Sequence, residues 1–239
     1  MTMIVRNLQQ VRDRITTACM AAGRNPESVR LLAVSKTFDA SAVVAATSDG
    51  QRAFGENYIA EGVDKITALR SLAATAQGME PYRLEWHCIG PVQSNKTRLV
   101  AEHFDWVQSV DRLKIAQRLS EQRPGDLPPL QICIQVNTDG GANKSGVQPD
   151  EALELALAIA ELPRLTLRGI MSIPEPTADF ETACTLHARA KTLFDTINAS
   201  GKLPVPMDTL SMGMTADMEA AIHAGSTMVR VGTAIFGSR

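Results

Sequence analysis

The sequence has few aromatic residues, almost no net charge and no long hydrophobic run. Phe, Trp and Tyr make up 4% of the 239 residues, and 24 Lys and Arg residues stand against 26 Asp and Glu, a formal net charge of −2. Proteins that bind nucleic acid electrostatically normally carry a basic excess, so the balance argues against that class. No stretch approaches the roughly 20 consecutive apolar residues of a membrane-spanning helix, so we expect no contact with a membrane.

Cysteine and histidine are also scarce, with four of each scattered at Cys19, Cys88, Cys133, Cys184, His87, His103, His187 and His223. Their spacing matches neither a metal-binding pattern nor a CxxC motif. The N-terminal segment carries charges throughout and lacks the apolar core of a signal peptide. We therefore predict a reduced, cytoplasmic protein without a metal site.

A regular alternation of apolar and amphipathic segments is present instead. Short apolar runs, typical of strands buried on both faces, start roughly every 28 residues, at 31–37, 52–57, 84–90, 105–110, 130–137, 165–173, 207–212 and 227–232. Helical patterns lie between many of them, at 40–50, 94–103, 150–162, 180–201 and 215–225. Apolar residues recur every three to four positions from Val5 to Ala22, which predicts an additional N-terminal helix.

Eight strand–helix units in a chain of this length predict a single α/β domain over residues 1–239, a closed (β/α)₈ TIM barrel. The alternative is an open doubly wound sheet, which normally carries a GxGxxG-type turn after its first strand. Here the first strand is followed by SKTFDA, which contains no glycine. This turn favours the barrel.

Lys36 ends the first predicted strand, where the working face of such a barrel lies. A lysine at a strand end often extends into water without further function. Alternatively, a lysine in a partly desolvated barrel mouth can form a Schiff base with a carbonyl compound, since desolvation favours the neutral amine. Lys36 by itself does not decide between these interpretations.

The last two strands supply candidate anion-binding groups. Arg230 lies within a strand that should be buried, so its charge needs an anionic or accepting partner, either a neighbouring acid or a ligand. Glycine-containing turns follow at 210–218 and 231–237, where backbone N–H groups can approach a phosphate. Ser211 and Thr233 could add hydroxyl donors, and Thr215 is the predicted N-cap of the helix after the first turn.

A lysine and a phosphate site on opposite sides of one barrel mouth suggest a phosphorylated carbonyl ligand. Pyridoxal 5′-phosphate (PLP) meets this description, with its aldehyde on Lys36 and its ring nitrogen toward Arg230. An arginine there disfavours protonation of the ring nitrogen, because two cations would repel each other.

Several motifs resemble one known family, the pyridoxal phosphate homeostasis proteins. They are AVSKT (33–37), FGENY (54–58), WHCIGPVQSNK (86–96), NKSGV (143–147), RGIMSIP (168–174), SMGMTADMEAAI (211–222) and GSTMVRVGTAIFG (225–237). The resemblance covers nearly the whole chain in the family's order. It implies a PLP-binding barrel of fold type III, related to the N-terminal domain of alanine racemase.

The resemblance also implies roles for individual residues. Lys36 would hold PLP covalently as a Schiff base, Arg230 would contact the ring nitrogen and Asn57 would lie near the cofactor. The phosphate would be bound by Ser211, Gly213, Gly232 and Thr233. The glycine-rich segment 138–142 before NKSGV departs from the expected pattern and leaves the role of this loop open.

Two functions from different classes follow. The family is regarded as a regulator of vitamin B6 supply, so the resemblance implies a PLP carrier or buffer without established turnover, with apo PLP enzymes as possible recipients. The alternative is an amino-acid racemase, which needs a second base opposite Lys36. Racemases take this base, a tyrosine, from a second domain of a partner subunit, whereas the tyrosines of this chain are Tyr58 and Tyr82. Without the racemase-type contact between subunits, we expect a monomer. A lysine-based aldolase without PLP is the least favoured reading.

Two further motifs remain ambiguous. Lys96 and Arg98 could attract an anion at a helix start, although a solvated helix face is the preferred interpretation. His87 lies beside Trp86 in the third predicted strand, where a core histidine with satisfied hydrogen bonds is favoured over an acid–base role.

Overall fold

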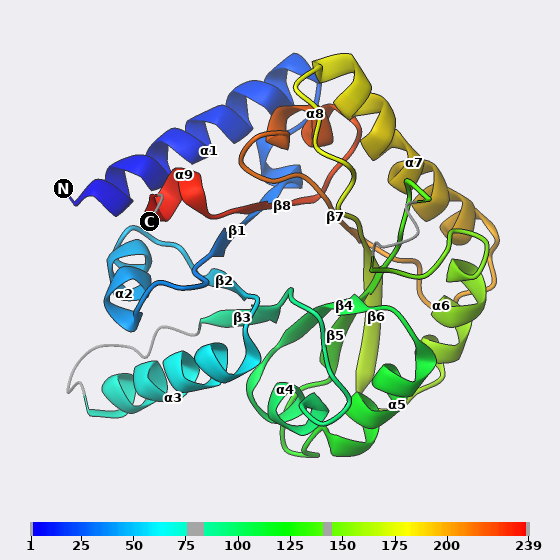
Figure 1. Ribbon diagram of the computed structural model, residues 1–239, viewed down its shortest axis with the longest axis horizontal. Coiled ribbons are helices and arrows are strands. Elements are labelled where there is room, and N and C mark those ends of the chain that lie inside the picture. Colours follow the sequence, from blue (N-terminus) through cyan, green and yellow to red (C-terminus); the bar gives the residue numbers. More distant parts are fainter. Residues whose placement is uncertain (1, 76–83, 141–144, 238–239) are drawn as a thin grey trace.

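Eight parallel strands close into one barrel, in which each strand pairs with the next along the chain and the eighth pairs with the first (Figure 1). The structure, a computed structural model, describes residues 2–75, 84–140 and 145–237. The strands are β1 (Arg30–Val34), β2 (Ala53–Glu56), β3 (Glu85–Cys88), β4 (Trp106–Val110), β5 (Leu130–Gln135), β6 (Leu165–Met171), β7 (Thr209–Ser211) and β8 (Met228–Val231). Seven lie within predicted runs and β1 begins one residue before its run, so the predicted TIM barrel is confirmed.

Helices cover the outside of this barrel. They are α1 (Met3–Ala21), α2 (Ala40–Ser48), α3 (Ile59–Thr75), α4 (Thr97–His103), α5 (Leu113–Gln122), α6 (Ala152–Ala160), α7 (Phe180–Ala199), α8 (Met218–His223) and α9 (Thr233–Phe236), with a 3₁₀ turn η1 (Pro26–Ser28). The predicted helical patterns are each represented, whereas α3 and α5 were not predicted as elements. In the described part of the chain, no helix is both long enough and apolar enough to cross a membrane.

The predicted N-cap of α8 is wrong by two residues. The helix begins at Met218 after the N-cap Asp217, not after Thr215. Asp217 accepts a hydrogen bond from the backbone N–H of Met214 at 2.6 Å, which closes a turn before the helix starts. Thr215 is therefore left outside the helix, in the loop after β7.

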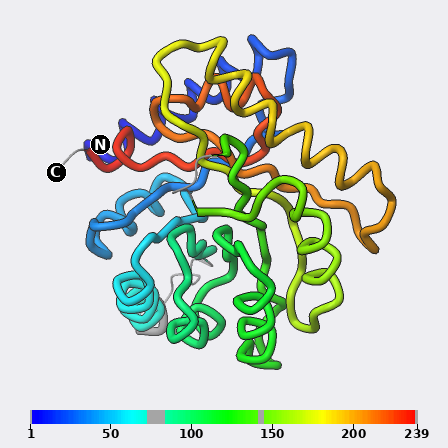
Figure 2. The backbone as a smooth tube through the Cα atoms, turned by 45° about the vertical axis from the view of Figure 1, so that its right-hand side comes forward, coloured from blue at the N-terminus to red at the C-terminus, as the bar shows by residue number. Residues whose placement is uncertain are grey.

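The additional helix α1 holds the loops that follow β7 and β8. It lies alongside α8 and α9 (Figures 1 and 2), with the buried side chains of Leu8, Val11 and Ile15 in its apolar face. Arg14 pairs with Glu219 at 2.8 Å and also donates to the carbonyl oxygen of Thr215 at 3.0 Å. These contacts fix the segments that the sequence predicts to bind phosphate.

The inside of the barrel is packed separately from the main hydrophobic core, which lies between strands and helices. Two small apolar clusters fill part of the inside, one made of Leu32, Ala53 and Met228, and the other of Trp106, Cys133 and Met171. The His87 ring stacks on Trp106 with 5.0 Å between ring centroids. The predicted core role of His87 is confirmed.

Candidate functional site

A pocket of about 360 Å³ opens where β1, β2 and β8 end. It brings together five of the seven predicted site residues, namely Lys36, Asn57, Arg230, Gly232 and Thr233. The remaining walls come from Val34, Ile89, Ile173, Met214, Thr215 and Ala216. Cationic groups, hydroxyl groups and apolar side chains therefore surround one small volume.

Lys36 enters this pocket from the loop directly after β1. Its side chain is exposed, whereas the preceding Ser35 is fully buried. The next residue, Thr37, has a φ of +70°, in the left-handed region that a β-branched residue rarely adopts. The backbone thus turns sharply directly after the residue that carries the exposed amine.

Asn57 reaches the pocket from the end of β2. Its carbonyl group passes so close to Gly90 that a Cβ on that glycine would lie 2.1 Å from the carbonyl oxygen. Only glycine can occupy position 90 without moving the loop that carries Asn57. Close packing of the loops after β2 and β3 therefore places Asn57.

Arg230 forms the floor of the pocket from within β8. Its side chain is buried and donates to Ser211 Oγ at 2.7 Å and to the Ser172 carbonyl oxygen at 2.9 Å. Burial lowers the pKa of Arg230 to about 10, so the guanidinium still carries its charge at neutral pH. A fixed cation with two directed hydrogen bonds thus faces the pocket.

Below Arg230, a chain of hydrogen bonds runs down the inside of the barrel. Ser211 donates to Gln108 Oε1 at 2.6 Å, and Gln108 Nε2 lies 2.9 Å from His87 Nδ1. His87 Nε2 lies 2.7 Å from Glu85 Oε1, at the opposite end of the barrel. Burial lowers the pKa of His87, which keeps the ring neutral, with Nδ1 accepting from Gln108 and Nε2 donating to Glu85.

This chain accounts for Ser211, which the structure does not bring to the pocket wall. The hydroxyl is fully buried and joins Arg230 to Gln108. Its geometry is that of a residue that orients Arg230. Direct contact between Ser211 and a phosphate stays a prediction that this geometry does not favour.

The loops after β7 and β8 meet at a pair of hydroxyl groups, where Thr233 Oγ1 lies 3.2 Å from Thr215 Oγ1. Thr215 was predicted as a helix cap and not as a site residue. The glycine turn just before it is the sequence signal that could have identified it. Gly213 is not among the residues that line the pocket; its φ is +93°, and a Cβ there would lie 2.4 Å from that of Ala221.

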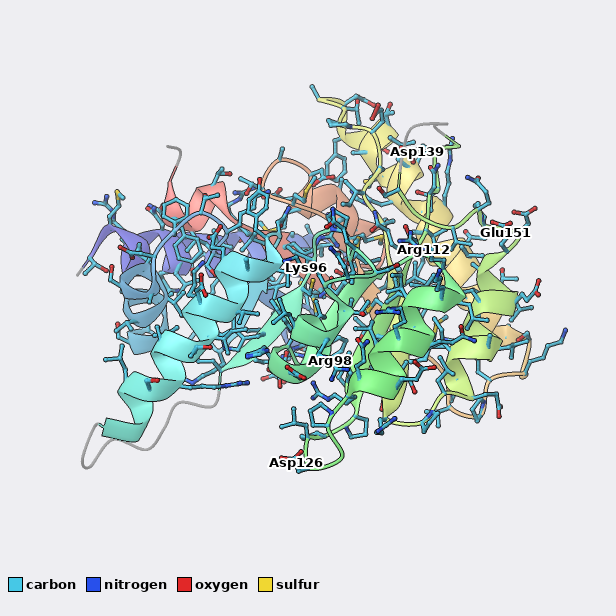
Figure 3. All side chains as sticks on the ribbon, turned by 60° about the horizontal axis from the view of Figure 1, so that its bottom comes forward. Lys96, Arg98, Arg112, Asp126, Asp139 and Glu151 are labelled. Carbon is cyan, nitrogen blue, oxygen red and sulfur yellow. The ribbon has the colours of Figure 1, made fainter. Side chains whose placement is uncertain are left out.

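Other predicted candidates lie outside the pocket. Arg98 is 67% exposed and pairs with Glu102 at 3.6 Å on α4 (Figure 3), as expected for a solvated helix face. Tyr58 is exposed and does not line the pocket. Tyr82 and the first two residues of NKSGV, Asn143 and Lys144, lie outside the described residues. Within the described ranges, no group of three metal-ligating side chains occurs.

The residues present fit PLP. The pocket is lined by an exposed amine, by a hydroxyl pair with a glycine turn and by a buried cation. Ile89 and Ile173 supply apolar walls suited to a flat ring. These features match an aldehyde, a phosphate and a ring nitrogen, respectively.

Comparison with known proteins first defines the class. The chain matches the family model "Alanine racemase, N-terminal domain" over residues 6–239. A solved alanine racemase from Clostridium difficile 630 shares the fold with a TM-score of 0.73 at 16% identity, over 98% of this chain and 57% of that one. The protein is thus a barrel domain of the alanine racemase type.

Closer relatives define the family. The pyridoxal phosphate homeostasis protein of Escherichia coli K12 is 54% identical over 99% of this chain and 97% of that protein. The protein of the same name from Pseudomonas aeruginosa is 52% identical over 100% and 97%. PipY of Synechococcus elongatus, solved with PLP bound, has a TM-score of 0.81 at 31% identity over 98% and 100%. The chain belongs to the family of pyridoxal phosphate homeostasis proteins, which confirms the resemblance.

Proposed function

We propose that this protein binds PLP through Lys36 and acts in PLP homeostasis in the cytoplasm, as a monomeric carrier or buffer. One observation carries the proposal: a single pocket joins an exposed lysine, a buried arginine and a threonine pair. The names of the relatives and the PLP-bound PipY structure support it independently.

Each residue of the pocket has a part in this proposal. Lys36 would hold the cofactor through a Schiff base between its Nζ and the aldehyde carbon, a condensation that releases one water molecule. Thr215, Gly232 and Thr233 would hold the phosphate, and Asn57 would lie near the ring. Arg230 donates toward the ring nitrogen and disfavours its protonation, because Arg230 itself stays charged. Bound PLP supplies an aldehyde that exchanges between amines and a ring that accepts electron density.

The pocket favours a carrier over a racemase. Racemisation needs a proton-transferring group on each face of the substrate carbon. Among the described residues that line the pocket, Lys36 is the one that carries an amine able to transfer a proton. Tyr58 lies outside the lining, so the described pocket offers a base on one side.

Borohydride reduction tests the attachment. Reduction of the PLP-loaded protein should fix a pyridoxyl group on Lys36, to be located by peptide mass spectrometry. Lys36→Ala should lose the visible absorbance band of the bound cofactor, whereas Lys96→Ala serves as the control because Lys96 lies outside the pocket lining. Labelling at another lysine, or an unchanged band in Lys36→Ala, would refute the assignment.

A second experiment separates carrier from enzyme. The loaded protein is incubated with L-alanine and other amino acids, and the products are resolved by chiral chromatography. In parallel, reactivation of an apo PLP enzyme is compared with protein-bound and free PLP as donors. A carrier should reactivate the apoenzyme without inverting the amino acids, and sustained formation of D-amino acids would instead establish a racemase.

A further inference from the structure

We infer that Glu56, Glu61 and Lys65, together called the Lys65 cluster, position Lys36 by holding the backbone on both of its sides. The cluster lies outside the pocket lining and belongs to β2 and α3. This inference rests on the proposed function and adds positioning residues to it.

The cluster binds two of the three polar groups of Ser35, the residue before Lys36. The Ser35 carbonyl oxygen accepts from Lys65 Nζ at 2.9 Å, and the Ser35 hydroxyl donates to Glu56 Oε1 at 2.6 Å. The Ser35 N–H donates to the Gly55 carbonyl oxygen at 3.0 Å. Ser35 is thus tied to the end of β2 by its backbone and its side chain.

The same cluster holds the residue after Lys36. Glu61, in the first turn of α3, accepts a hydrogen bond from the Thr37 N–H. Thr37 has a positive φ, which costs free energy for a β-branched residue and persists only where its surroundings enforce it. The carboxylate of Glu61 is a direct restraint on this unfavourable backbone geometry.

Lys65 joins the two sides. Its ammonium group reaches Ser35 O at 2.9 Å, Glu56 Oε1 at 2.6 Å and Glu61 Oε1 at 3.2 Å, which uses the three donors that an ammonium group has. The side chains of Lys65 and Glu56 are 4% and 0% exposed. Burial raises the pKa of Glu56, against the effect of the hydrogen bonds from Lys65 and Ser35.

A buried ion pair of this kind is a poor source of stability, because removing two charges from water offsets their attraction. Its contacts indicate instead that it fixes the backbone conformation around Lys36. Two of its three members bind the backbone of residues 35 and 37, and Lys36 stands between them. The cluster therefore fixes the backbone from which the Lys36 side chain extends.

The positioning matters for the covalent step. Imine formation joins Nζ of Lys36 to the aldehyde carbon and releases water, so it needs the amine at one place in the pocket. Binding of the ring and phosphate depends on Arg230, Thr215 and Thr233, which lie on other loops. Loss of the cluster should therefore impair covalent attachment more than it impairs binding of the rest of the cofactor.

Glu61 is the member to change, because its side chain is 31% exposed whereas those of Lys65 and Glu56 are buried, so we expect its removal to disturb folding least. Glu61→Ala removes both contacts, and Glu61→Gln keeps an acceptor oxygen for the Thr37 N–H. Glu102→Ala is the matched control, since Glu102 is 35% exposed and also pairs with a basic residue one helical turn away.

Three measurements are made on each variant. They are PLP attachment followed by absorbance, binding of pyridoxine 5′-phosphate, which has an alcohol in place of the aldehyde, and thermal unfolding. Glu61→Ala should weaken attachment about 10-fold to 100-fold, with pyridoxine phosphate affinity within about twofold of the wild-type value. Glu61→Gln should recover part of the loss, and Glu102→Ala should match the wild type in both ligands.

Three outcomes would overturn the inference: unchanged attachment in Glu61→Ala, equal losses for both ligands, or no recovery in Glu61→Gln. These outcomes differ from failure of the proposed function. If borohydride fails to label Lys36 in the wild-type protein, the proposed function is wrong whatever the variants do. If the wild type and Glu61→Ala are labelled equally well and equally fast, only the positioning role is lost.

Discussion

The two cations of the pocket are supported in opposite ways. Arg230 is held by its own guanidinium group, which binds Ser211 and the Ser172 carbonyl oxygen. Lys36 is held through its neighbours in the chain, and the described residues provide its Nζ with no hydrogen bond. A cation that only has to face a ring can be fixed at its tip, whereas an amine that forms and breaks a bond must keep its tip free.

The chemistry of the two supports differs as well. Lys65 and the two glutamates form a charged cluster, and the chain from Ser211 through Gln108 to His87 consists of neutral groups ending at Glu85. A buried charged cluster adds little net stability, but the loss of one member is severely destabilising because it leaves a buried charge unpaired. A neutral chain loses one hydrogen bond at a time. Mutations in each support test this difference, and those in the charged cluster should have the largest effects.

The largest expected effect is that of Lys65→Met. The change leaves the fully buried Glu56 without its cation, which costs about 3–5 kcal/mol of unfolding free energy. Adding Glu56→Gln removes the buried charge and should restore a large part of the stability without restoring cofactor attachment. Urea denaturation of both variants measures this, and a single mutant as stable as the double mutant would contradict it.

A smaller effect is expected at the centre of the neutral chain. Gln108→Leu leaves the Ser211 hydroxyl and His87 Nδ1 without their partner inside the barrel, which costs about 1–3 kcal/mol. Lys36 should still be labelled after borohydride reduction, because its support is separate, while PLP dissociates faster as Arg230 loses its orientation. Urea denaturation and a dissociation assay test both halves of this prediction. Loss of labelling would show that the two supports are coupled.

The chain should also respond to pH. Since burial lowers the pKa of His87 in the folded state, the unfolded state binds more protons, and stability should fall as the pH drops below the ordinary histidine range near 6.5. Thermal unfolding of the wild type between pH 8 and pH 5, compared with His87→Gln, measures the contribution. A variant whose profile declines as steeply as that of the wild type would assign the decline to other groups.

The smallest effect concerns the strain beside Lys36. Thr37→Asn replaces a β-branched residue by one that tolerates a positive φ, so we expect a gain of about 0.5–1 kcal/mol in unfolding free energy. PLP attachment should be unchanged, because the Thr37 N–H still donates to Glu61. Slower attachment in this variant would mean that the threonine side chain itself shapes the loop.

The sequence predicted the architecture well, because strands buried on both faces leave continuous apolar runs. It also predicted the pocket residues that follow strand ends, such as Lys36 and Asn57. Ser211 was expected at the phosphate site. It is instead the last residue of the three-residue strand β7, and its side chain points into the barrel and not toward the mouth. Period-two alternation cannot be read over so short a strand.

The Lys65 cluster was not predicted at all. Glu56 lies at the end of an apolar run, and Lys65 lies on a helix whose pattern gives no sign that one lysine points inward. Their pairing depends on how α3 packs against β2 and meets the loop after β1, which is a tertiary property. That the cluster restrains the backbone at Ser35 and Thr37, on either side of Lys36, can be recognised only once this packing is known.

The tightly packed interior of the barrel limits how a ligand can enter and leave the pocket. Leu32, His87 and Gln108 are fully buried and Trp106 is nearly so, which closes the route from the far end of the barrel to the pocket. A ligand held by Lys36 would then leave through the same mouth of the pocket by which it entered. A recipient protein bound over this opening would prevent a new ligand from entering until it dissociated. Release of one ligand and binding of the next would therefore be successive steps.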